Sequence, residues 1–207
     1  MTWLYLPYEP QKMSAELLEH IHAHADIDQD EAEIILRAFK SKTIHKHEHI
    51  LSPGEICRHE TFIISGCFKM SYVDSQGAEH VASFGVENWY IGDFYSFLSE
   101  KPSIYTITAL EDSQILQIFK PDLDRLLNTI RGMERYYRIL FQNAFVSLQS
   151  RTMEQISATA EERYHTFLKR YPGFQNRVPQ YLIASYLGIS PQFLSKIRKR
   201  SARKRID

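Results

Sequence analysis

The segment PQYLIASYLGISPQFLSKIRKR, residues 179–200, has the features of two short helices joined by a tight turn. Pro179 suits the start of the first helix, because its missing N–H would be unpaired there anyway. Gly188 ends that helix, since glycine adopts the left-handed backbone conformation without a Cβ penalty. Ser190 followed by Pro191 is a start signal for the second helix. The segment therefore predicts a helical pair with a turn of three residues.

The two predicted helices differ in what they expose. Ala184 is small where the helices approach, and Leu194 and Ile197 give the second helix an apolar side. Its other side is polar and cationic, which suits a DNA major groove, where Gln192 and Lys196 read base edges, Ser195 assists and the remaining cations contact phosphates. The predicted DNA-binding residues are Ser190, Gln192, Ser195, Lys196, Arg198, Lys199, Arg200, Arg203, Lys204 and Arg205. We expect residues 201–207 to form a flexible basic tail; a helical hairpin with a solvated outer face is the alternative.

Charge is distributed unevenly along the 207 residues, although the total is zero. From Arg151 onward, 12 Lys and Arg stand against four Asp and Glu, a net charge of +8, which leaves −8 for residues 1–150. A basic end is typical of a module that binds a polyanion, whereas an acidic end repels nucleic acid. No apolar run approaches the roughly 20 residues of a membrane span, and the N-terminus lacks a signal-peptide pattern. We therefore expect a cytoplasmic protein with no membrane partner.

Residues 42–119 have the pattern of many short strands. Segments rich in Ile, Val, Tyr, Phe and Thr alternate with turn residues, as at 52–54 and 75–77. This spacing predicts a β-sandwich, barrel or jelly roll. Two helices are expected before it, at 14–24 and 28–39, the second opening with a capping box at Asp28.

Helical signals return after the strands. Pro121 opens one helix, and a run from Met133 to about Ile156 has an apolar stripe near the spacing of a coiled-coil seam. A helix this long cannot bury both flanks on a small β domain, so we interpret the stripe as a dimer interface; packing on its own β domain is the alternative. The predicted interface residues are Tyr137, Leu140, Phe141, Ala144 and Leu148. A further helix starting at AEERYHTFLKR, residues 160–170, is expected beneath the C-terminal pair.

The chain resembles the bacterial Crp/Fnr family of transcription regulators, most closely at IASYLGIS (183–190) and LSKIR (194–198). The order of elements extends the resemblance to nearly the full length. It implies an α+β fold in three parts: an effector-sensing β-roll domain with N-terminal helices over 1–120, a connecting and dimerisation helix over 121–157 and a helix-turn-helix domain over 158–207. The β-roll would be a jelly-roll-like cyclic nucleotide-binding fold, with the family's glycines at Gly54, Gly66, Gly77 and Gly92.

The resemblance also locates a divergent effector pocket. Relatives that bind cyclic AMP carry a Gly-Glu pair followed, ten residues after the glutamate, by Arg and a small polar residue. Gly92-Asp93 and Ser103-Ile104 stand at those positions, so the arginine that would hold the phosphate is missing. Since a charge-assisted hydrogen bond contributes about 1.5–3 kcal/mol, we predict that micromolar cyclic AMP does not bind. Lys101 lies close enough in sequence to reach in, and core aromatic side chains are the alternative filling.

Histidine and cysteine provide the other candidate chemistry. His20, His22 and His24 form one dense set, and His45, His47 and His49 form another that would share a face if it lay on one strand. No carboxylate or thiol lies at an obvious ligand spacing, so we expect exposed histidines and no metal, with a cupin-like metal-binding barrel as the rival. Cys57 and Cys67 are too few for a four-thiolate cluster and are expected to be buried, inert thiols.

These observations lead to one hypothesis and one alternative. The hypothesis is a non-enzymatic, homodimeric, sequence-specific transcription regulator without a cofactor, whose partners are double-stranded DNA, an unidentified small-molecule effector and RNA polymerase. The relatives' Arg-Glu pair after the helix start is Pro191-Gln192 here, so their DNA consensus is not expected to apply. The alternative is a ligand-sensing or metal-binding β-barrel protein whose basic helices contact a protein or RNA.

Overall fold

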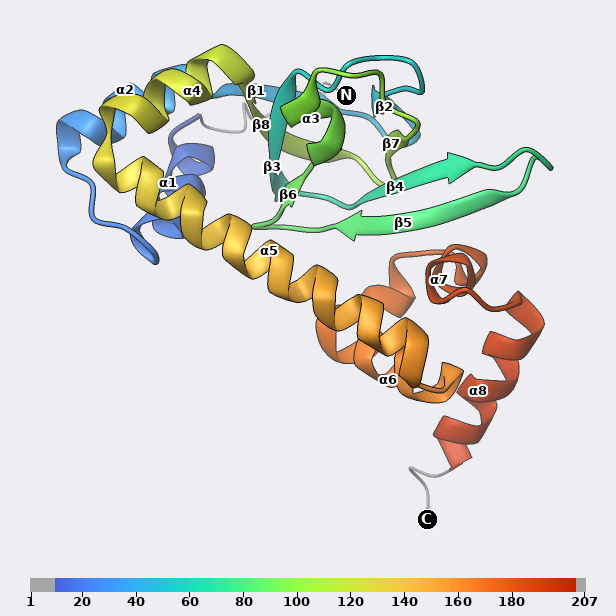
Figure 1. Cartoon of the computed structure of the whole chain (residues 1–207). Coiled ribbons are helices and arrows are strands. Elements are labelled where there is room, and N and C mark those ends of the chain that lie inside the picture. The colour runs from blue at the N-terminus through green and yellow to red at the C-terminus, as the bar shows by residue number, and fades with distance from the viewer. Residues whose placement is uncertain (1–9, 204–207) are drawn as a thin grey trace, which may run out of the picture. The chain divides into compact units, whose positions relative to one another are not determined.

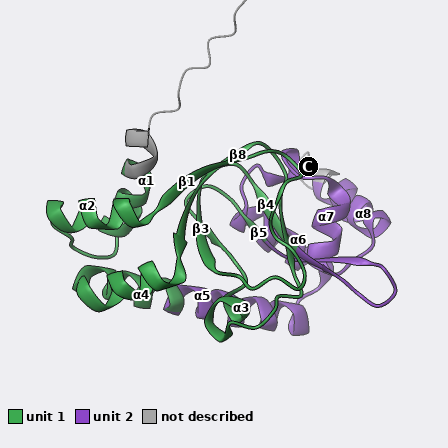
Figure 2. Ribbon diagram, turned by 90° about the horizontal axis from the view of Figure 1, so that it is seen from above, with its two compact units in different colours: residues 1–70, 84–141 green, residues 71–83, 142–207 purple. Residues whose placement is uncertain are grey.

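The computed structural model of the protein describes residues 10–203, which fold into two compact units (Figure 2). The first holds the chain up to Met70 together with Phe84–Phe141. The second holds Ser71–Ser83 together with the chain from Gln142 onward. The sequence analysis places domain boundaries after residues 120 and 157 and does not assign the Ser71–Ser83 hairpin to the helical unit.

The first unit begins with two helices, α1 (Pro10–His22) and α2 (Gln29–Ala38) (Figure 1). Asp28 and Glu31 form the predicted capping box: the Asp28 carboxylate accepts from the Glu31 N–H at 2.9 Å, and the Glu31 carboxylate accepts from the Asp28 N–H at 3.0 Å. Both groups satisfy N–H donors that a helix start leaves unpaired. Helix α1 starts four residues before the predicted position.

Two four-stranded antiparallel sheets form the predicted β-roll (Figure 1). One sheet has the order β1-β8-β3-β6, and its strands are β1 (Lys40–Ile44), β8 (Ser113–Phe119), β3 (His59–Ser65) and β6 (Tyr90–Ile91). The other has the order β2-β7-β4-β5, with β2 (His49–Leu51), β7 (Thr106–Ala109), β4 (Phe68–Val73) and β5 (Glu79–Gly85). Gly54 and Gly77 have φ values of 88° and 83° in the predicted turns, a conformation that glycine adopts without a Cβ penalty.

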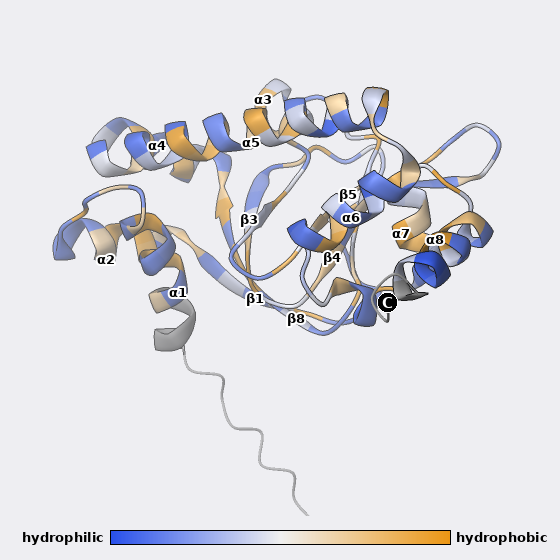
Figure 3. Ribbon diagram, turned by 90° about the horizontal axis from the view of Figure 1, so that it is seen from below, coloured by the Kyte–Doolittle hydropathy of each residue, from blue (hydrophilic) through white to orange (hydrophobic). Residues whose placement is uncertain are grey.

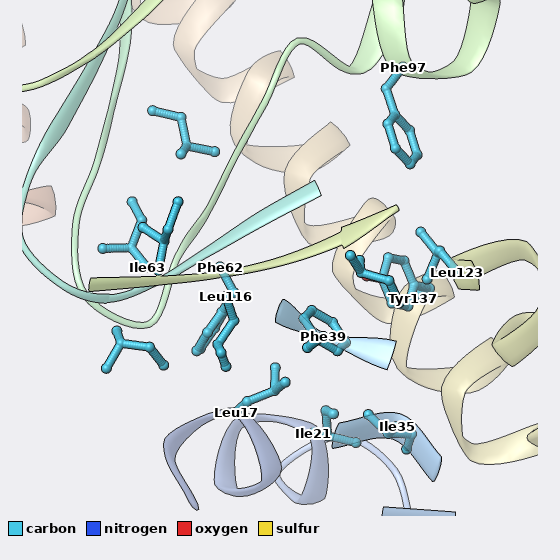
Figure 4. Close-up of a cluster of buried hydrophobic side chains, with 14 of the residues drawn as sticks. Leu17, Ile21, Ile35, Phe39, Phe62, Ile63, Phe97, Leu116, Leu123 and Tyr137 are labelled. Carbon is cyan, nitrogen blue, oxygen red and sulfur yellow. The ribbon is translucent and has the colours of Figure 1, made fainter. Parts of the chain in front are cut away.

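The core of the first unit lies between the strands and the helices (Figure 4). Central strand β3 has five successive buried residues, 60–64, because it is covered on both faces. Leu17, Ile21 and Ile35 from α1 and α2 pack into this cluster. Full burial of each such side chain stabilises the fold by about 1.5–3 kcal/mol.

Three further helices complete the first unit and lead into the second. Helix α3 (Phe94–Ser99) lies in a segment for which no helix was predicted. Helix α4 (Lys120–Thr129) begins with a proline in its first turn, and α5 (Arg131–Ser157) follows after one residue. The first turns of α5 are core, since Met133, Tyr136 and Tyr137 are buried.

The second unit contains α6 (Ala160–Arg170), a short 3-10 helix (Phe174–Asn176), α7 (Gln180–Leu187) and α8 (Pro191–Arg203). Thr159 and Glu162 form a capping box at the start of α6. The rings of Phe167, Tyr171, Phe174 and Tyr186 cluster with centroids 5.0–6.2 Å apart. These contacts place α6 against α7, as the sequence predicts.

Candidate functional site

The turn between α7 and α8 has the predicted chemistry. Gly188 caps α7 in the left-handed conformation at φ 67°, and its N–H donates back into the helix. The Ser190 hydroxyl accepts from the Phe193 N–H at 3.2 Å at the start of α8. Ala184 is fully buried, and Leu194 and Ile197 are 1% and 2% exposed. The small residue and the two apolar residues therefore hold α8 against the rest of its unit.

The other side of α8 is free of the core. All the predicted DNA-contacting residues of the turn and helix from 190 to 200 are exposed: Ser190, Gln192, Ser195, Lys196, Arg198, Lys199 and Arg200. Figure 3 shows hydrophilic and hydrophobic residues alternating along this helix. One expectation is corrected, because α8 continues to Arg203 and residues 201–203 are helical rather than part of a flexible tail. Lys204 and Arg205 lie outside the described residues.

The predicted effector residues divide into a buried pair and an exposed set. Asp93 and Ser103 are 5% and 3% exposed, whereas Lys101 and Ile104 are exposed. Asp93 caps α3: one carboxylate oxygen accepts from the N–H groups of Tyr95 and Ser96 at 3.1 and 3.2 Å. The other accepts from the Ser103 hydroxyl at 2.7 Å. Both oxygens are therefore occupied by this chain.

Ser103 also fixes the neighbouring loop. Its N–H donates to the Glu55 carbonyl, and its carbonyl accepts from the Gly54 N–H, both at 2.8 Å. The Ser103 hydroxyl oxygen accepts from the Tyr105 N–H at 3.0 Å. Asp93 and Ser103 thus hold the α3 start and the residue 54–55 loop together, and of the predicted set only Gly92 borders an open cavity.

That cavity has a volume of about 520 Å³ and lies within the first unit. Its polar lining comes from Arg58, His59 and Thr61 at or just before the start of β3, and from Gln117 on β8. Sequence analysis did not single out these residues. The available signal was Thr61 and Gln117, polar residues inside otherwise apolar strands, which the register places directly opposite each other.

A buried polar network joins β3 to α5 in the first unit. Glu60 is 2% exposed and accepts a hydrogen bond from the Tyr137 hydroxyl at 2.7 Å. Burial raises the pKa of the Glu60 carboxyl to about 7, against the opposing effect of that hydrogen bond. The Tyr136 hydroxyl lies 2.7 Å from His20 Nδ1 and donates to the Tyr90 hydroxyl at 3.3 Å. Burial, with a smaller contribution from His24, lowers the pKa of His20.

This network corrects part of the predicted dimer stripe. Tyr137 is 3% exposed and bonded within its own unit, so it is not available to a second subunit. Leu140 and Phe141 are partly buried against the same core, and the Phe141 ring lies 5.3 Å from that of Phe94. Ala144 and Leu148 are exposed. The first half of the stripe thus follows the alternative reading, packing on its own β domain.

The histidines do not share a strand face. Strand β1 ends at Ile44 and β2 begins at His49, while His47 lies in the turn between them at φ 72°. His49 Nδ1 lies 2.9 Å from the Thr108 hydroxyl. Over residues 10–203 no three His, Cys, Asp or Glu side chains gather as a metal site would require. Cys57 and Cys67 are buried free thiols, as expected, and burial raises the pKa of Cys57.

Comparison with known proteins follows the same division. Residues 41–130 match the cyclic nucleotide-binding domain family. This segment runs from β1 to the end of α4 and includes the Asp93–Ser103 pair of the cyclic nucleotide-binding domain. A search of curated protein sequences found no significant match.

Solved Crp/Fnr-type regulators share the fold of both units. The c-di-GMP-responsive global regulator CLP of Xanthomonas campestris is 12% identical with a TM-score of 0.67, over 86% of this chain and 93% of CLP. FixK2 of Bradyrhizobium japonicum is 15% identical with a TM-score of 0.67, over 80% of this chain and 85% of FixK2. A CooA mutant of Carboxydothermus hydrogenoformans is 15% identical with a TM-score of 0.64, over 82% and 79% of the two chains.

The cyclic nucleotide-binding domain is thus followed by several helices, as in those regulators. Across residues 10–203, none of the helices is both long enough and apolar enough to cross a bilayer.

Proposed function

We propose that the protein is a sequence-specific, DNA-binding transcription regulator of the Crp/Fnr type. The observation that carries the proposal is α8, whose apolar residues Leu194 and Ile197 are buried while its cationic and amide side chains are exposed. A helix held in this way presents a cationic ridge of a width that fits the major groove. The pair α7 and α8 is then a helix-turn-helix with α8 as the recognition helix.

The charge distribution supports the same proposal. The chain from Arg151 onward carries a net charge of +8, and neutralisation of several phosphates by such a unit gives affinity for DNA that falls with salt. Gln192 and Lys196 would read base edges, with Ser195 assisting. Arg198, Lys199 and Arg200 would contact phosphates, together with Ser190 at the turn.

We further propose that two copies act together through α5. Beyond Phe141 this helix exposes large apolar side chains, including Phe145 at 66% and Ile156 at 75%. The set comprises Phe145, Val146, Leu148, Met153 and Ile156. Residues 145, 148, 152 and 156 follow the 3- and 4-residue steps of a coiled-coil seam. A two-fold pair would place two recognition helices on half-sites roughly 34–36 Å apart.

Cyclic AMP is not the proposed effector. The Asp93 carboxylate is already fully engaged by Tyr95, Ser96 and Ser103, so a ribose hydroxyl would have to displace these bonds. Ser103 provides no positive charge for a phosphate. Calorimetric titration of the full chain with cyclic AMP is expected to show no binding in the micromolar range, and a micromolar dissociation constant would contradict this part of the proposal.

Selection of duplexes from a random DNA pool by the full chain tests the proposed function. Enrichment of a pseudo-palindrome whose half-sites lie about one helical turn apart is expected. Binding of the enriched duplex should exceed binding of random DNA by about a thousandfold or more at physiological salt. Equal binding of all duplexes, or no retention of DNA, would refute the proposal.

A further inference from the structure

The cavity of the first unit combines features of a small-molecule site that differ from the Asp93–Ser103 pair. Its volume of about 520 Å³ lies in the range of ligand pockets. Most of its wall is apolar, with Leu51 from β2, Ile91 from β6 and Ile107 from β7. These strands belong to both sheets, so the cavity lies inside the roll. A ligand body that fits here is apolar.

One polar group in the wall lacks a partner. Gln117 is 6% exposed, and its Nε2 donates to the Thr61 hydroxyl oxygen at 3.0 Å. Its Oε1 is buried and accepts no hydrogen bond from any of residues 10–203. An unpartnered buried acceptor costs about 1–3 kcal/mol, and a donor brought by a ligand would recover it. Thr61, 2% exposed, has its hydroxyl proton available beside it.

The mouth of the cavity is cationic. Arg58 and His59 are exposed where the lining meets solvent. Burial, together with the positive charges of Lys42 and Arg58, lowers the pKa of His59, which reports a positive potential at this point. Arg58 forms no ion pair within the described chain, and Glu55, the acidic residue of the lining, accepts from the Ser52 N–H at 2.7 Å.

We infer that this cavity binds a small organic anion with an apolar body, its carboxylate on Arg58 and its hydrogen-bond donor on Gln117 Oε1. The cation at the mouth and the acceptor inside the roll fix the orientation, and the apolar wall between them covers the body. Thr61 can donate to an acceptor on the same ligand. The Asp93–Ser103 pair has no part in this binding except to hold the loop at Gly54 and Glu55 in place.

The test uses the full chain labelled with ¹⁵N and titrated with three acids: indole-3-acetate, benzoate and hexanoate. Saturable shifts of the amide signals of Cys57, Thr61 and Gly92 are expected with at least one acid, and weaker binding with its amide, such as indole-3-acetamide. In Arg58→Gln the acid should bind about tenfold less tightly, because one charge-assisted hydrogen bond is lost. Arg37→Gln, which removes an exposed arginine of the same unit that pairs with Glu33, is the matched control.

The inner acceptor has its own control. Gln117→Leu should weaken indole-3-acetate several-fold but leave 1-methylindole-3-acetate, which has no N–H donor, unchanged. Thermal unfolding of each variant shows whether it is folded. The inference is overturned if none of the three acids shifts these amides, if acid and amide bind equally, or if Arg58→Gln binds as the wild type does. None of these outcomes depends on DNA binding, which is measured separately.

Discussion

Ser185 on α7 bonds to the backbone of Val81 on β5, and both lie in the second unit. The Ser185 hydroxyl oxygen accepts from the Val81 N–H at 3.0 Å, and its proton is donated to the Glu79 carbonyl at 3.1 Å. Strand β5 is at the edge of its sheet, where such groups would otherwise be unpaired. Arg151 reinforces the contact, since its guanidinium lies 4.1 Å from the centre of the Tyr186 ring and donates to the Ala82 carbonyl.

Ser185→Ala should release the edge of β5 from α7. Both hydrogen bonds are lost, and a hydrogen bond of this kind contributes about 0.5–1.5 kcal/mol. The Val81 amide is therefore expected to exchange with solvent about tenfold faster, as measured by hydrogen exchange with NMR detection.

Ser147→Ala, at an exposed position of α5, is the control and should leave the Val81 amide unchanged. Unaltered protection of Val81 in Ser185→Ala would show that the hydroxyl does not hold the strand. A second consequence distinguishes local from global effects: the amides of β3, in the other unit, should keep their wild-type rates.

Glu60 should make the stability of the first unit depend on pH. Its folded pKa of about 7 lies above the ordinary value of 4.5, so the folded state binds the proton more tightly than the unfolded chain. The contribution is complete below about pH 4.5 and is lost as the pH rises to about 7. Glu60→Gln removes this dependence, and the free energy of unfolding of the wild type relative to the variant should fall by about 3 kcal/mol from pH 4.5 to 8.

Denaturant unfolding of both proteins across this pH range measures the difference. Glu134→Gln, at an exposed position on the same helix as Tyr137, should differ from the wild type by a constant amount. A constant difference for Glu60→Gln as well would mean that the buried carboxyl keeps its ordinary proton affinity.

The exposed stripe on α5 predicts where dimerisation can be broken. Phe145→Asp together with Leu148→Asp places charge on a seam that excludes water in a paired helix, so the sedimentation coefficient should change from that of a dimer to that of a monomer. Far-UV circular dichroism should remain that of the wild type, because both side chains are exposed in the single chain.

Ser150→Asp, on the same part of α5, is the matched control for added charge, and it should remain dimeric. If the double variant stays dimeric, the subunits pair through another surface. If the wild type is itself a monomer, the proposed arrangement of two recognition helices fails.

Local signals in the sequence were sufficient for most elements of the fold. Asp28, Gly77 and Gly188 determine a helix start, a turn and a helix end through interactions within a few residues, and all three were predicted. Fold class followed from periodicity, and the α+β architecture is confirmed. Helix α3 was missed because its cap, Asp93, was interpreted only as a ligand position.

Long-range contacts could not be predicted in the same way. Tyr137 has the heptad spacing of a dimer seam, but its hydroxyl bonds to Glu60, 77 residues earlier in the chain. Similarly, the cavity brings Arg58 and Gln117 together through the pairing of β3 with β8. Spacing along one helix or strand carries no information on such partners. The exposure of Lys196 was predictable because its apolar neighbours lie on the same helix.

Lys196 and the cations that follow it on α8 should have different effects on DNA binding. A lysine bonded to a base edge contributes about 1–3 kcal/mol of discrimination between bases, whereas a phosphate contact contributes equally to all sequences. Lys196→Met should therefore relax the preferred sequence at one position of each half-site. Arg200→Gln should weaken specific and random duplexes alike and reduce the slope of log K against log salt by about one per contact.

Binding of the selected duplex, its single-base variants and random DNA at several salt concentrations separates the two effects. Lys169→Met, a cation of α6 outside the recognition helix, is the control and should leave the ranking of duplexes unchanged. If Lys196→Met and Arg200→Gln lose affinity equally for every duplex, α8 binds only the phosphate backbone, and base reading must come from another part of the chain.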